Sequence, residues 1–183
     1  MVRDDIAAFA RVAGVVPGAC SALPWCESLT VFGLELPADY RAFVDSFGAG
    51  TVGSRLTLST PWPLHIAEAG VTTLRVMLDR AAEIGVLLRG LREDFPALFP
   101  YAFHPEPGGL LSWAGGVGGE QCFWLTEASD PDDWSVVVWD KADWRRYDMG
   151  MVALLIRALT GTDPFLNDLV APAPGRPLWN PRR

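Results

Sequence analysis

Hydrophobic residues recur at helical spacing near the N-terminus and predict three short helices. Residues 3–13 form an amphipathic pattern that ends at Gly14. Residues 25–33 predict a second helix, and the segment that follows Pro37 predicts a third, which ends at Gly48. Proline suits the first turn of a helix, because its missing N–H would have no partner there. The third helix should bury the positions that share one face, namely Leu36, Tyr40, Phe43, Val44 and Phe47.

The middle of the chain predicts a strand, a rigid turn and a long helix. Residues 55–60 alternate between polar and apolar and indicate a strand, whereas the two prolines of residues 61–65 indicate a turn. Residues 71–93 then predict a long helix. Its inward positions should be Leu74, Met77, Leu78, Ala81, Leu88 and Leu91. Its charged outer face should carry Arg75, Asp79, Arg80, Glu83 and Arg92.

After Pro100 the pattern changes from helical to alternating. Strands are predicted over residues 109–113, 121–126, 135–140 and 144–148. The glycine-rich stretch 114–120 joins the first two of these strands, and a turn over residues 128–134 leads to the third. Such short connections favour antiparallel pairing.

The end of the chain predicts one more helix, followed by a proline-rich tail. Residues 148–161 place Met151, Leu154, Leu155 and Ala158 on one face, and Gly161 ends the helix. The tail, residues 171–183, should be extended or mobile, which leaves residues 1–170 as one domain. Early helices, clustered strands and a closing helix are typical of an α+β fold. We expect a mixed or mostly antiparallel sheet flanked by helices.

Composition narrows the functional class. Half of the 183 residues are hydrophobic, which excludes a disordered chain. The net charge is −7, from 22 acids and 15 bases, which argues against a general nucleic-acid binder. An acidic chain is suited to a basic protein partner, although the same charge also serves solubility alone. Arginine supplies all the bases except Lys141, which is typical of a GC-rich bacterial gene.

Neither a membrane span nor a metal or cofactor site is expected. The first ten residues carry acids, and the apolar stretch near Arg157 is too short for a bilayer, which needs about 20 apolar residues. We therefore expect a cytoplasmic protein. Its three cysteines, Cys20, Cys26 and Cys122, form no CxxC pair and should be free thiols.

Catalytic motifs are also missing. The glycine-rich stretch lacks the Lys and Ser/Thr of a phosphate loop, and Glu120 would repel phosphate. His65 and His104 are the candidate general bases, but no Gly-x-Ser-x-Gly motif supplies a nucleophile. His104 can work with Cys122 or Ser112 only if the fold brings them together. We expect no enzyme, no cofactor and no catalytic residue.

An acidic cluster and a group of tryptophans are the most informative features. Glu127, Asp130, Asp132 and Asp133 fit a cation site, a solvated loop or a landing surface for a basic partner, and EF-hand spacing is absent. Five tryptophans lie within residues 113–144, on both sides of this cluster: Trp113, Trp124, Trp134, Trp139 and Trp144. Period-2 alternation separates Cys122 and Trp124 from Phe123 and Leu125, and Val136 and Val138 from Val137 and Trp139.

The tryptophans have two interpretations. They are either core residues with hydrogen-bonded indoles or anchors of a partner surface. We expect core positions for Trp113 and Trp124 and leave Trp134 and Trp139 open.

The order of motifs over residues 25–165 resembles the SUKH superfamily, the Smi/Knr-type domain. The first block has Trp25, Gly33, Leu36-Pro37, Tyr40 and a Gly48-x-Gly50 stop. The second is HPEPGGLLSWAGGVGGEQCFWLTEASDPDDWSVVVWD, and DMGMVALLIRALTG is similar to the closing helix of that family. One departure is the glycine-rich turn, where members often carry Asn or Asp and this chain has only Glu120.

The resemblance implies a protein-binding domain without a common catalytic set. Bacterial SUKH proteins act as immunity proteins that neutralise cognate polymorphic toxins, often nucleases, and fungal relatives are regulatory hubs. We expect a partner-binding site at Glu127, Asp130, Asp132, Asp133, Trp134 and Trp139. The alternatives are a regulatory or scaffolding domain without a toxin and, further off, a small-molecule binder or small enzyme that uses His104, Glu120 or the acidic cluster.

Overall fold

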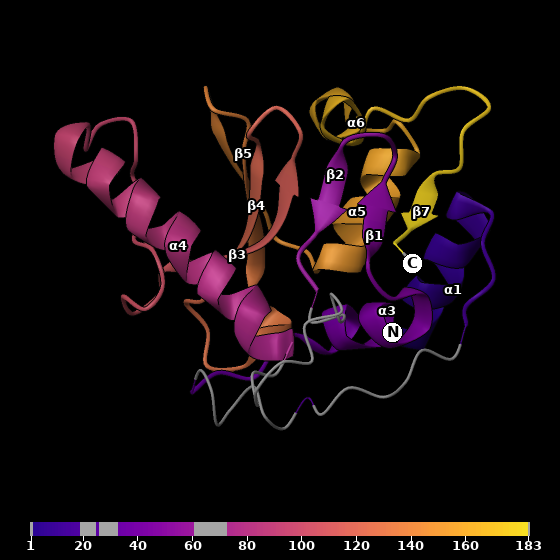
Figure 1. Cartoon of the computed structure of the whole chain (residues 1–183), viewed down its shortest axis with the longest axis horizontal. Helices are drawn as coiled ribbons and strands as arrows, with labels where there is room; N and C mark the ends of the chain where they lie inside the picture. The colour runs from indigo at the N-terminus through magenta and orange to yellow at the C-terminus, as the bar shows by residue number, and fades with distance from the viewer. Residues whose placement is uncertain (1, 19–24, 26–32, 61–72, 183) are drawn as a thin grey trace.

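The computed structural model of the chain describes residues 2–18, 25, 33–60 and 73–182 (Figure 1). The described residues form five α-helices: α1 (Val2–Ala13), α3 (Ala38–Phe47), α4 (Thr73–Asp94), α5 (Met151–Leu159) and α6 (Pro164–Val170). The predicted helix over residues 25–33 and the predicted turn over residues 61–65 lie outside the described residues, apart from Trp25 and Gly33.

A single antiparallel sheet forms the centre of the fold. Its strands are β1 (Gly50–Val52), β2 (Leu56–Leu58), β3 (Leu110–Gly116), β4 (Gln121–Leu125), β5 (Ser135–Trp139), β6 (Trp144–Tyr147) and β7 (Trp179–Pro181). They lie in the order β6-β5-β4-β3-β2-β1-β7, and each neighbouring pair is antiparallel. The predicted α+β fold is confirmed, because helices pack on this sheet within one domain.

The larger core lies between one face of the sheet and helices α1, α3, α5 and α6, and Met77 and Ala81 from the first half of α4 also belong to it (Figure 1). Every face residue predicted for the third helix is buried, from Leu36 to Phe47. Tyr40 also donates its hydroxyl to the Ser59 carbonyl at 2.6 Å, which ties α3 to the end of β2. In α5 the predicted inward residues are all fully buried.

The second half of helix α4, from Ile84 on, packs on the opposite face of the sheet and encloses a second, smaller core (Figure 1). This core joins Leu88 of α4 and Phe103 to residues of β3, β4 and β5. The predicted alternation is confirmed, because Cys122 and Trp124 face the larger core whereas Phe123 and Leu125 face the smaller one. Both faces of the sheet are therefore covered by helix over β4 and β5.

Three short elements were not expected from the sequence: β1, α6 and β7. The chain around β1 reads as a helix stop because glycines flank it, yet Gly50–Val52 pairs with β2 and with β7. A side chain at position 50 would overlap the indole of Trp179, so glycine is needed there. Helix α6 begins with Asp163 as its cap and Pro164 in its first turn, a signal that the periodicity alone did not show.

The proline-rich tail returns to the sheet. Residues 171–183 were expected to be extended or mobile, and Trp179–Pro181 is indeed extended but pairs as strand β7. Trp179 is 3% exposed and makes edge-to-face contacts with Phe9 and Phe43 at ring distances of 6.3 and 5.3 Å. The tail therefore closes the larger core, which the hydrophobic pattern of so short a segment did not reveal.

Candidate partner-binding surface

The acidic loop, residues 127–133, connects β4 to β5 and includes a turn of 3-10 helix at Pro131–Asp133. Glu127 pairs with Arg146 of β6, with 3.2 Å between Oε2 and Nη1. The same guanidinium contacts Asp148 at 2.9 Å. Glu127 is exposed, but its charge is partly compensated by this arginine.

Two other acids of the loop serve as helix caps. Asp132 accepts a hydrogen bond from the Ala38 amide at 2.6 Å, at the N-terminus of α3. The residue at the cap position of α3 itself is Pro37, which provides no side-chain cap. Asp130 in turn accepts from the Asp132 amide at 3.0 Å. A carboxylate is favourable at both positions, because helix N-termini carry unpaired N–H groups and partial positive charge.

Trp134 is buried and does not form a surface anchor. It is 4% exposed, packs against Trp124 at a ring distance of 6.5 Å, and donates its indole N–H to the Ala128 carbonyl at 2.8 Å. Its position favours the core interpretation of this residue, in which the indole fixes the acidic loop to the larger core. Asp133 beside it is exposed.

Trp139 lies at the opposite end of β5 from the acidic loop. The strand runs from Ser135 to Trp139, about 13 Å at 3.3 Å per residue. Trp139 faces the side of the sheet that α4 covers and stacks on Trp144, with 5.3 Å between ring centroids and 15° between ring planes. We call these two half-buried residues the indole pair. The six predicted site residues therefore do not form one continuous site.

Beside the indole pair lies a group of exposed apolar residues that the sequence reasoning missed. The described residues include six exposed large hydrophobic side chains, and four of them are on α4 or the turn that follows it. These four are Val86, Leu87, Phe95 and Leu98, with exposed fractions of 61%, 64%, 53% and 64%. We call them the α4 patch. The run Val86-Leu87-Leu88 was a usable signal, because a helix cannot turn three consecutive apolar residues toward the same core.

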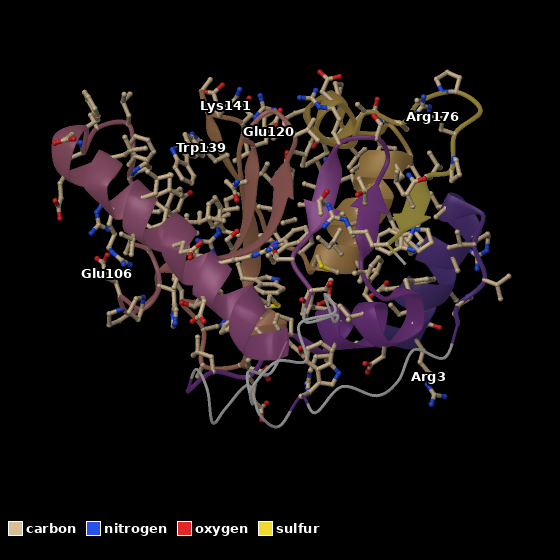
Figure 2. The ribbon with its side chains drawn as sticks, viewed as in Figure 1. Arg3, Glu106, Glu120, Trp139, Lys141 and Arg176 are labelled. Carbon is tan, nitrogen blue, oxygen red and sulfur yellow. The ribbon has the colours of Figure 1, made fainter. Side chains whose placement is uncertain are left out.

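The α4 patch and the indole pair are connected through shared contacts. Trp144 donates its indole N–H to the Leu98 carbonyl at 2.9 Å. Phe99, next in the chain, meets Trp139 and Trp144 at ring distances of 5.5 and 6.0 Å. Figure 2 shows Trp139 between α4 and the sheet, with Lys141 close by.

The two arginines of α4 nearest to this region are engaged within the fold. Arg92 was expected on the outer face, but it pairs with Glu106 at 2.8 Å and donates to the Tyr101 carbonyl. Arg89 donates to the His104 carbonyl at 2.9 Å. They hold the segment after α4 against the helix and contribute little positive charge to the outer surface.

Glu120 fills the glycine-rich turn. Its carboxylate accepts from the Gly118 amide at 2.9 Å and pairs with Arg55 at 2.7 Å. A side chain at Gly116 or Gly118 would collide with this carboxylate. The turn therefore holds a carboxylate from its own chain.

Two of the candidate catalytic residues, Cys122 and His104, lie on opposite sides of the sheet. Cys122 is buried in the larger core, where burial raises the pKa of its thiol, whereas His104 belongs to the segment on the α4 side of the sheet. Burial, together with nearby Arg89, lowers the pKa of His104. Ser112 donates its hydroxyl to Gln121 at 3.3 Å. His65 lies outside the described residues.

Two features are missing from the part of the chain that the structure describes. No group of three or more His, Cys, Asp or Glu side chains is placed to hold a metal ion there. Among the same residues, no helix combines the length and apolar character needed to cross a membrane.

No protein-family model, curated protein or solved structure matches this chain. The resemblance to the SUKH superfamily stays a prediction from the motifs of residues 25–165. What the structure contributes is a surface, and its clearest feature is the combined α4 patch and indole pair.

Proposed function

We propose that this chain is a non-catalytic protein-binding domain, an immunity protein that binds and neutralises a cognate toxin. The observation that carries the binding role is the α4 patch, where four of the six exposed large hydrophobic residues gather on one helix and its turn. Exposed apolar side chains that gather in one place are typical of protein interaction surfaces. The toxin-neutralising role is drawn from the resemblance to SUKH proteins.

The net charge of −7 supports a basic partner, and nuclease toxins are of that kind because they bind phosphate. Opposite potentials accelerate encounter and help to orient the two proteins. Neutralisation would follow from occlusion of the toxin's active site by the bound domain, which requires no chemistry from this chain.

The test is protection of cells from a toxin. The cytotoxic domain encoded beside this gene is expressed with and without the chain, and growth is measured. We expect growth to be restored by this chain and not by an unrelated acidic protein of the same size. Purified proteins should form a stable complex by size-exclusion chromatography.

Gene context separates this proposal from a regulatory or scaffolding role. If no cytotoxic domain is encoded nearby, or if the neighbouring toxin is neither bound nor neutralised, the immunity role is wrong. Binding of a housekeeping protein instead would favour the regulatory role.

A further inference from the structure

We propose that the α4 patch and the indole pair together form one docking surface for a protein partner with an apolar centre and a basic rim. This proposal rests on one part of the proposed function, namely that the chain binds a protein. It does not require that this protein is a toxin. It differs from the expectation that the acidic loop is the contact.

Apart from Val86, which lies about 100° around the helix from Leu87, the apolar residues of this surface follow one another. Leu87, Leu91 and Phe95 are spaced four residues apart, so they follow one another along one side of α4, and Phe95 continues the helical bonding by donating its amide to Leu91. Leu98 follows within the same turn and contacts Trp144 through its carbonyl. Leu91, Trp139 and Trp144 pack on the smaller core, so their exposed edges rest on a rigid base.

The charges around the surface are mainly negative. Exposed or half-exposed acids border it on α4 and in the β5–β6 turn, namely Glu83, Glu93, Asp94, Asp140 and Asp143. Among the side chains that the structure describes in the same two segments, the exposed bases that oppose them are Arg80 and Lys141. Hydrogen bonds from the amides of Asp143 and Ala142 lower the pKa of Asp140.

This charge pattern selects among possible occupants. A second copy of the chain would bring one acidic rim against another, and like charges facing each other oppose association. An anionic membrane would be repelled for the same reason. A partner whose basic residues surround an apolar centre meets both features at once, as in protein interfaces with a desolvated centre and a polar rim.

The acidic loop is less suited to docking. Asp130 and Asp132 already cap helices, Glu127 pairs with Arg146, and Trp134 is buried. Of the four acids in this loop, Asp133 is exposed and caps no helix. The loop also contains no exposed large apolar side chain.

The experiment uses two probes and two pairs of matched variants of the full chain. The first probe is a synthetic amphipathic peptide of leucine and lysine, and the second is the neighbouring toxin domain of the growth test. Leu87→Asp with Leu98→Asp disrupts the apolar centre, and its control is Val117→Asp, which changes a residue that is 72% exposed elsewhere. Glu83→Lys with Asp94→Lys reverses the rim, and its control is Asp133→Lys.

For the peptide, we expect backbone amide NMR shifts of the wild-type chain to cluster at residues 83–98 and 139–144. The apolar double variant should bind about tenfold more weakly or worse, as for the loss of interface hot spots. The rim variant should bind more weakly and lose salt dependence. Both controls should bind as the wild type does.

The proposal is overturned if shifts cluster at residues 127–133, if Val117→Asp weakens binding as much as the double variant does, or if the peptide does not bind. It is also overturned if the chain binds anionic phosphatidylglycerol vesicles, or forms a dimer at about 0.15 M salt that the double variant abolishes.

The toxin arm distinguishes this proposal from the proposed function. If the double variant neutralises the toxin as well as the wild type does, the docking surface is wrong and the immunity role stands. If the peptide maps to α4 but the toxin is not neutralised, the surface stands and the immunity role is wrong.

Discussion

A half-buried carboxylate links two helices that pack on the larger core. Asp39, in the first turn of α3, accepts a hydrogen bond from the Val152 amide at the start of α5, at 3.0 Å. A side chain at position 150 would overlap the same carboxylate oxygen, so glycine makes this contact possible. Burial raises the pKa of Asp39 above 3.8, more than the hydrogen bonds lower it.

The raised pKa of Asp39 predicts a pH-dependent cost to stability. Above pH 3.8 the unfolded chain releases this proton more readily than the folded chain, so this residue's contribution to stability falls as pH rises through the interval up to its folded pKa. Asp39→Asn keeps an oxygen for the Val152 amide and removes the charge. The free energy of unfolding of the variant, relative to wild type, should therefore rise as the pH increases above 3.8.

Urea denaturation at several pH values measures this difference. A difference that stays constant across the range would show that Asp39 titrates alike in both states. Asp133→Asn, at an exposed position, is the control and should leave the pH profile of stability unchanged.

At the level of elements, α3 depends on a cap that comes from a distant part of the chain. Asp132, 94 residues away, accepts from the Ala38 amide. Asp132→Ala removes this bond, and we expect the free energy of unfolding to fall by about 0.5–2 kcal/mol, the usual effect of losing an N-cap. Chemical denaturation measures it. Asp133→Ala should change stability by less than about 0.5 kcal/mol, and equal effects of the two substitutions would contradict the capping role.

Strand β7, at the edge of the sheet beside β1, is a second element that depends on contacts with distant parts of the chain. Trp179 fills the space between Phe9, Phe43 and Phe47 above Gly50. Trp179→Ala should lower the free energy of unfolding by about 3–5 kcal/mol, because it leaves a cavity in a packed core. Arg182→Ala keeps the hydrogen bond from the backbone amide of residue 182 to the Ala49 carbonyl, so it should leave the free energy of unfolding nearly unchanged. A wild-type melting temperature for Trp179→Ala would mean that the tail is not part of the stable fold.

The sequence predicted the larger elements better than the short ones. Helices α1, α3, α4 and α5 and strands β3 to β6 are found where the periodicity placed them, because each contains enough residues to show a period. Strands β1 and β7 have three residues each, and their pairing is decided by partners far away in sequence. The exposed apolar residues of α4 were not predicted, because charged residues on the same helix indicated a polar outer face.

For the whole molecule, one sheet carries two cores on its opposite faces. Phe123 and Trp124 are neighbours in β4, and each packs into a different core. The two layers should therefore unfold together. Phe123→Ala should destabilise the domain by about 3–5 kcal/mol. Tryptophan fluorescence and far-ultraviolet circular dichroism should still report one coincident transition.

A separate early transition in that variant would mean that the α4 layer detaches alone. Val117→Ala, at an exposed position in the glycine-rich turn, is the matched control and should leave both signals at their wild-type midpoint.

The sequence by itself determined the fold class, the alternation of β4 and β5, the acidic charge and the lack of a catalytic motif. These properties depend on local periodicity and composition, which every segment carries within itself. It could not decide which acids serve as caps, whether Trp134 faces a core, or where exposed apolar residues gather. Asp132 reaches Ala38, and Trp144 reaches Leu98, only after folding. Surface and core are properties of packing between distant segments, and only the tertiary structure assigns them.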